Sequence, residues 1–140
     1  MKIKFDDKPL ILSLDRKLKK MPQNIDRALA ITAQQGLNMI LARTAKGKGI
    51  NFPFKSYSDK YARFRAQKGR KIAPVDLNFT GRMLGSLTTE RVRSGVQRIK
   101  FSRAEESRKA YFNNQTRPFF GFNQREKAFL GKFFRSKLAI

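Results

Sequence analysis

The sequence contains no cysteine, no histidine and no tryptophan, and only 10 of its 140 residues are Asp or Glu. Without thiols or imidazoles, the chain can form neither disulfides nor Cys/His zinc sites, and no histidine can serve as a general acid or base. No apolar run approaches the ~18 residues that span a membrane. The short apolar patch near the N-terminus is flanked by acids, unlike a signal peptide. We therefore expect an intracellular protein.

The few acidic residues suggest no catalytic constellation. Asp6 and Asp7 are adjacent, as are Glu105 and Glu106, and neighbours in a helix or strand point apart. We expect both pairs to be solvated charges that balance nearby Lys and Arg. A metal-dependent nuclease needs several convergent acids. The sequence thus nominates no catalytic residue, no metal ligand and no cofactor, and we do not expect an enzyme.

Positive charge is abundant, with 32 Lys and Arg and a formal net charge of +22. Such an excess repels itself unless a polyanion or an acidic protein surface lies nearby. Nucleic acid is the default partner, because basic patches gain affinity by releasing counterions from phosphates. The alternative is a surface that only keeps the protein soluble. The length, with 40% hydrophobic residues, predicts a single domain over residues 1–140 with a real core.

Two segments have helical periodicity. Apolar residues recur at three- and four-residue steps from Ile25 to Leu41, which predicts a long helix over about residues 22–44. Near the C-terminus, Asn123 and Glu126 have the spacing of a capping box. The stripe that follows is apolar at helical spacing and consists of Phe129, Leu130, Phe133, Phe134 and Leu138. It predicts a closing helix whose stripe packs in the core or at a subunit interface.

Strands are expected between the helices. Residues 86–93 and 96–102 flank Ser94-Gly95, a compatible hairpin turn. The run from Leu10 to Leu14 suits a strand or the start of a buried helix, and residues 104–114 suit a helix or an irregular arm. Together these elements predict an α+β fold in which the long N-terminal helix and the C-terminal helix pack on a small antiparallel sheet.

Residues 45–75 lack a sustained pattern and are predicted to form a long basic loop. Tyr57, Tyr61 and Phe64 have helical spacing, which predicts a short helix over about residues 58–67. The aromatic residues either stack on bases or anchor the loop to the core. The candidate polyanion-binding residues are Lys46, Lys48, Lys55, Lys60, Arg63, Arg65, Arg70 and Lys71.

The stretch "PVDLNFTGRMLGSL", residues 74–87, raises the question of a phosphate-binding loop or a nucleophile elbow. A Walker loop requires a Lys after its second glycine, but Ser86 follows Gly85 directly. A nucleophile elbow needs G-x-S-x-G and a histidine partner. Both readings fail, so we interpret the stretch as a structural joint.

The order of four segments carries a family resemblance. "LKKMPQNIDRALAITAQQGLNMILARTA", "FPFKSYSDKYARFR", "DLNFTGRMLGSL" and "RPFFGFNQREKAFLGKFF" follow one another over about residues 14–138. The chain resembles the tail-completion family of tailed bacteriophages, also called virion-morphogenesis or head–tail joining proteins. The matching positions are Leu77, Thr80-Gly81, Met83, Ser86-Leu87 and residues 117–121. Many members carry a His-Tyr/Gly-type segment before the Arg-Pro-Phe motif, where this chain reads "AYFNNQTRPFFG".

The resemblance implies a structural virion protein, assembled in the host cytoplasm, that completes the tail or seals its junction with the head. It implies a homo-oligomeric ring of six subunits or a multiple of six. Its partners would be neighbouring neck, tail-tube or connector proteins and phage DNA, with no membrane and no small-molecule substrate. The rival class is a free-standing nucleic-acid-binding module.

The resemblance also assigns roles to two motifs. It implies a turn at Thr80-Gly81 and close backbone packing at Gly85, which agrees with the steric freedom of glycine and with local hydrogen bonding by threonine. A bulky segment before the last helix is the candidate ring-interface anchor, because aromatic residues and Arg dominate interface energies. Its residues are Arg117, Pro118, Phe119, Phe120 and Phe122. The alternative is that this segment packs inside the protomer.

Overall fold

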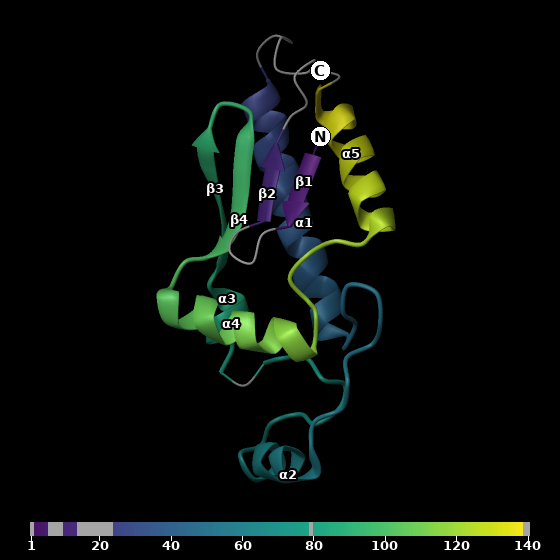
Figure 1. The fold of residues 1–140 in the computed structure, drawn as a ribbon, viewed down its shortest axis with the longest axis vertical. Coiled ribbons are helices and arrows are strands. Elements are labelled where there is room, and N and C mark those ends of the chain that lie inside the picture. The colour runs from purple at the N-terminus through teal and green to yellow at the C-terminus, as the bar shows by residue number, and fades with distance from the viewer. Residues whose placement is uncertain (1, 6–9, 14–23, 79, 139–140) are drawn as a thin grey trace.

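The computed structural model describes residues 2–5, 10–13, 24–78 and 80–138 (Figure 1). Its strands are β1 (Lys2–Phe5), β2 (Leu10–Ser13), β3 (Leu87–Arg93) and β4 (Val96–Phe101). Its helices are α1 (Ile25–Ala45), α2 (Asp59–Gln67), α3 (Arg82–Gly85), α4 (Ala104–Thr116) and α5 (Gln124–Leu138). The predicted α+β fold is confirmed.

The four strands form one antiparallel sheet in the order β1-β2-β4-β3. The N-terminal hairpin joins the β3–β4 hairpin through β2 and β4, where Leu10 faces Ile99 and Leu12 faces Gln97. The β3–β4 turn needs a positive φ, which Gly95 supplies at 78°. Both predicted hairpin strands are confirmed. The run from Leu10, left open between a strand and the start of a buried helix, is the strand β2, whereas β1 was not foreseen from the sequence.

Helix α1 packs against β3 and β4, and α5 runs along α1 (Figure 1). The apolar face of α1 buries Leu29, Ala33, Leu37 and Ile40 together with Leu10 and Leu12 of the sheet. On α5, Leu130 and Phe134 are fully buried, while Phe129 is exposed, so the buried stripe of α5 is narrower than predicted. Helix α4, left open between helix and irregular arm, is helical.

The predicted capping box at the start of α5 is confirmed. The Asn123 side-chain oxygen accepts a hydrogen bond from the Glu126 backbone N–H at 2.8 Å, and the Glu126 carboxylate accepts from the Asn123 backbone N–H at 3.0 Å. These reciprocal bonds satisfy two amide groups that a helix N-terminus otherwise leaves without a partner. The sequence therefore fixes where α5 begins.

The segment between α4 and α5 corrects the interface prediction for its three phenylalanines. Phe119, Phe120 and Phe122 are 0%, 5% and 4% exposed, so their rings pack inside the protomer and leave almost no surface for a neighbour. A Cβ on Gly36 of α1 would lie 2.8 Å from the ring of Phe122. Because that distance is shorter than van der Waals contact allows, the glycine is what lets the ring approach the helix.

The joint at residues 80–86 is partly as predicted. Gly81 has a positive φ of 81°, and the Thr80 hydroxyl accepts a hydrogen bond from the Arg82 backbone N–H at 3.3 Å. The close backbone packing expected at Gly85 is wrong, since a Cβ there would meet nothing within 4 Å. The buried Ser86 hydroxyl instead closes α3 by donating to the Met83 carbonyl at 2.8 Å.

Candidate functional site

The candidate site is the basic arm, which we define as residues 46–78. Its helix α2 lies at the end of the molecule farthest from the sheet (Figure 1). The hydroxyl of Ser58 accepts a hydrogen bond from the Tyr61 backbone N–H at 3.3 Å and so caps α2. The short helix predicted over residues 58–67 is thus confirmed, with Ser58 as its cap.

The base of the arm is held by main-chain hydrogen bonds. The Ile50 N–H donates to the Pro118 carbonyl at 2.9 Å, and the Phe54 N–H donates to the Gly47 carbonyl at 2.9 Å. A Cβ on Gly49 would lie 2.6 Å from the Pro118 oxygen. Because that contact is closer than any side chain tolerates, Gly49 allows the arm to pack directly on the segment after α4.

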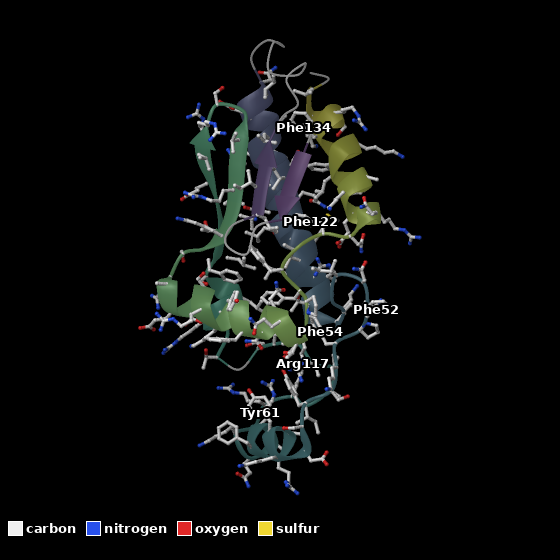
Figure 2. The ribbon with its side chains drawn as sticks, in the orientation of Figure 1. Phe52, Phe54, Tyr61, Arg117, Phe122 and Phe134 are labelled. Carbon is white, nitrogen blue, oxygen red and sulfur yellow. The ribbon has the colours of Figure 1, made fainter. Side chains whose placement is uncertain are left out.

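Arg117 ties the arm to the body of the protein. Its guanidinium donates to the Lys55 carbonyl at 2.7 Å and to the Ser56 carbonyl at 3.0 Å. Figure 2 shows the side chain at the junction between the body and the arm. Arg117 is half-buried and Pro118 is exposed, so these two predicted interface residues, unlike the phenylalanines, reach the surface.

Arg65 is a structural residue, which corrects its predicted role in polyanion binding. It is 1% exposed although it lies on α2. Its guanidinium donates to the carbonyls of Lys71 at 2.6 Å and Asn78 at 2.8 Å, and pairs with Asp76 at 3.5 Å. A buried cation with these partners folds the end of the arm back onto α2 and is not available to a phosphate.

The other predicted cations are all exposed on the arm: Lys46, Lys48, Lys55, Lys60, Arg63, Arg70 and Lys71. The structure shows core packing for only two of the aromatic residues of the arm and leaves three exposed. Phe54 and Tyr57 pack against the core, whereas Phe52, Tyr61 and Phe64 are 79%, 38% and 43% exposed. The arm therefore presents cations and aromatic rings together, in a shape held by its own hydrogen bonds.

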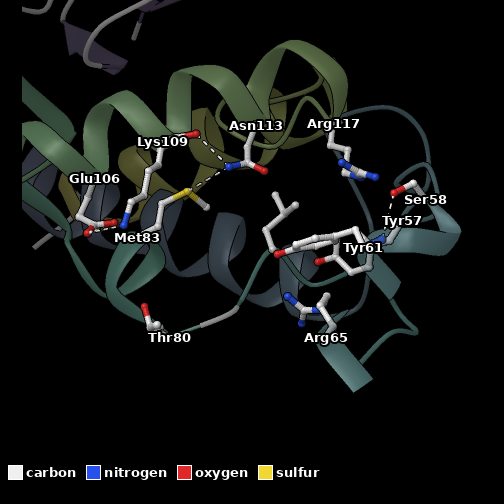
Figure 3. A pocket seen from close by; sticks show the side chains of 12 residues that line it. Tyr57, Ser58, Tyr61, Arg65, Thr80, Met83, Glu106, Lys109, Asn113 and Arg117 are labelled. Atoms are coloured by element: carbon white, nitrogen blue, oxygen red, sulfur yellow. Dashed lines mark hydrogen bonds and ion pairs between the residues drawn. The ribbon is translucent and has the colours of Figure 1, made fainter. Parts of the chain in front are cut away.

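A pocket of about 500 Å³ lies between the arm and α4 (Figure 3). One wall is formed by Tyr57 and Tyr61, whose rings meet edge to face at 5.0 Å. The guanidinium carbons of Arg65 and Arg117 lie 4.7 Å and 5.0 Å from the Tyr57 ring centre. Burial raises the pKa of Tyr57 above its ordinary value of 10.0, an effect that the charge of Arg65 partly opposes.

Glu106 on α4 lines the same pocket and was missed by sequence reasoning. Its side chain is 3% exposed, and one carboxylate oxygen accepts from Lys109 Nζ at 3.2 Å. The other oxygen, Oε2, is buried and has no hydrogen-bond partner in the described part of the chain. The prediction of a solvated charge is wrong for Glu106 and right for the exposed Glu105. Asp6 and Asp7 lie outside the described residues.

Within residues 2–5, 10–13, 24–78 and 80–138, no three His, Cys, Asp or Glu side chains gather closely enough to hold a metal ion. Over the same ranges, no helix combines the length and the apolar character needed to cross a membrane. Comparison of the chain with protein-family models, with curated proteins and with solved structures finds no match.

Proposed function

We propose that this protein is a structural component of a tailed-phage virion, where it completes the tail or joins it to the head as one subunit of a ring. The order of the four sequence segments that resemble the tail-completion family supports the class. The observation that carries the proposal is the basic arm, with seven exposed cations on a segment whose backbone is fixed to the body. Such an arm suits contact with a polyanion.

The physical argument rests on the position of the charge. A chain with a net charge of +22 gains most from a partner that neutralises it. A ring at a head–tail junction would lie beside packaged DNA and the acidic surfaces of neighbouring proteins. A closed ring joins two different surfaces of each protomer by one repeated contact. Arg117 and Pro118, at the base of the arm, are the surviving candidates from the predicted interface segment.

Purified particles test the virion role. We expect the protein to sediment with mature particles and to be detected in them by mass spectrometry. Deleting its gene should abolish infectious particles while leaving phage DNA synthesis unchanged. Mature particles that lack the protein would reject the proposal.

The salt dependence of DNA binding tests the arm. Changing Lys60, Arg63, Arg70 and Lys71 to Gln should lower the slope of log affinity against log salt by up to about four, because each lost phosphate contact lowers it by about one. The matched control changes four exposed cations elsewhere to Gln, namely Arg27, Arg93, Arg125 and Lys132. An equal fall in slope for the two variants, or no fall in the arm variant, would reject the arm as the contact.

The exposed rings of Tyr61 and Phe64 beside the arm cations favour a second candidate, a free-standing nucleic-acid-binding module. That candidate predicts a monomer or dimer that binds nucleic acid tightly by itself and is missing from particles. The particle experiment separates the two functions.

A further inference from the structure

We propose that the pocket between α2 and α4 binds an unpaired cytosine, whose exocyclic amino group donates a hydrogen bond to the free oxygen of Glu106. The inference goes beyond the virion role, because it assigns a ligand class to a site that the family resemblance does not mention. It requires only that a nucleic-acid strand reaches the arm.

The first step is the buried carboxylate. An ionised carboxylate only accepts hydrogen bonds, and buried polar atoms in folded proteins almost always have a partner. Glu106 lines the pocket, and its buried Oε2 has no partner among the described residues. A ligand in this pocket is therefore expected to bring a hydrogen-bond donor to that oxygen.

The second step is the charge of the side chains that line the pocket. Lys109 already pairs with the other carboxylate oxygen, and Arg65 and Arg117 line the same pocket. The three cations that line the pocket outnumber its one carboxylate, which disfavours a Lys or Arg side chain as the ligand because like charges repel. A neutral amino group attached to an anionic backbone satisfies both conditions, and carboxylates accept such a bond from the cytosine amino group.

The third step is the size of the pocket and the apolar side chains that line it. Tyr57 and Tyr61 supply aromatic rings at one end, and Leu77 and Met83 add apolar surface (Figure 3). Base–aromatic stacking is a common basis of single-strand binding, and a volume of about 500 Å³ is typical of pockets for small organic groups. Lys60 and Arg63 are exposed on the same helix as Tyr61, where they can contact the phosphates of the flanking strand.

Comparison of two pyrimidine strands tests the proposal. Fluorescence anisotropy would measure the affinity of the full-length protein for labelled oligo-dC and oligo-dT of equal length, since thymine has a carbonyl where cytosine has the amino group. We expect roughly tenfold tighter binding of oligo-dC, in line with the discrimination of a good base contact. Equal affinity of the wild-type protein for the two strands would overturn the proposal, whatever any variant does.

Glu106→Gln identifies the acceptor, because the amide offers a donor as well as an acceptor at this position. The variant should bind both strands about equally, with its affinity for oligo-dT changed less than about twofold. Glu105→Gln is the matched control, since Glu105 is the exposed neighbour and the change in charge is identical; it should retain the preference for oligo-dC. A preference for oligo-dC that survives in a folded Glu106→Gln protein, checked by circular dichroism, would overturn the assignment.

The arm variant separates this inference from the function proposed above. Its four substitutions should weaken binding of both strands and leave their ratio unchanged. A protein that is missing from particles but still prefers oligo-dC would refute the virion role alone. A protein that is found in particles but binds both strands equally would refute the base pocket alone.

Discussion

The guanidinium of Arg43 on α1 pairs with the carboxylate of Glu126 on α5 at 2.9 Å, and the two side chains are only 11% and 14% exposed. Arg43 also donates to the carbonyls of Phe119, at 2.8 Å, and Gly121. Glu126 in turn caps its own helix through Asn123. One arginine therefore connects the first helix, the last helix and the phenylalanine segment between α4 and α5.

Replacing Arg43 with Met should lower the free energy of unfolding by about 3 kcal/mol, because it leaves Glu126 and two carbonyls with no charged donor. Urea denaturation would measure the change. Arg27→Met, an exposed position on the same helix, should change stability by less than about 0.5 kcal/mol. Equal losses for the two variants would show that Arg43 does not organise the core.

Arg65→Gln should loosen the arm, since the carbonyls of Lys71 and Asn78 then lose their charged donor. Hydrogen exchange of the amides of α2 and of residues 70–78 should become roughly tenfold faster or more, while exchange in α1 is unchanged. Arg63→Gln removes the same charge from an exposed position on the same helix and should leave exchange as in the wild type. Similar acceleration in the two variants would contradict the buried clamp.

The raised pKa of Tyr57 predicts an alkaline loss of stability. The folded state favours the neutral phenol, so the stabilisation is fully present below the unfolded-state pKa of about 10 and is lost as pH rises through the higher folded-state value. Tyr57→Phe should make the fall in unfolding free energy between about pH 9 and about pH 11 less steep. A fall of the same steepness in the Tyr57→Phe protein would show that this phenol does not drive it.

Two helical glycines form a matched pair for testing the core. Gly36→Ala places a methyl group 2.8 Å from the Phe122 ring and should destabilise the protein by about 1–3 kcal/mol through overpacking. Gly131→Ala on α5 meets only the end of Arg135 at 3.8 Å and should stabilise it by up to about 1 kcal/mol, because alanine favours helix. Thermal unfolding of both proteins would compare them, and a stabilising Gly36→Ala would refute the close contact.

The features that the sequence predicts well are local. The capping box of Asn123 and Glu126 and the helix at residues 58–67 depend on residues three or four positions apart, and both are confirmed. The turn at Gly81 likewise needs only its own φ. Patterns of this kind are visible in one dimension because the interacting groups are neighbours in the chain.

The features that the sequence misses depend on partners far away or on main-chain atoms. The sequence does not distinguish Arg65 from the exposed Arg63 two positions earlier. The difference is a hydrogen bond from Arg65 to the carbonyl of Asn78, which lies 13 residues later in the chain. The sequence does not distinguish Glu106 from its neighbour Glu105. Only the folded structure shows that Glu106 lines the pocket between the arm and α4. The motif around Gly85 suggests a glycine that lets two backbone segments pack closely. In the structure Gly85 ends α3, and a Cβ there would have no neighbour within 4 Å. Tertiary packing decides each of these cases, and residue type does not reveal it.

Arg117 and Arg65 hold the arm through the carbonyl oxygens of residues 55, 56, 71 and 78. Every amino acid carries such an oxygen, so these four hydrogen bonds do not depend on which side chains project from those positions. Lys55 and Lys71 are thus free to change identity without altering the path of the backbone. Evolution or an experimenter can retune the electrostatic potential of this surface while its geometry stays constant.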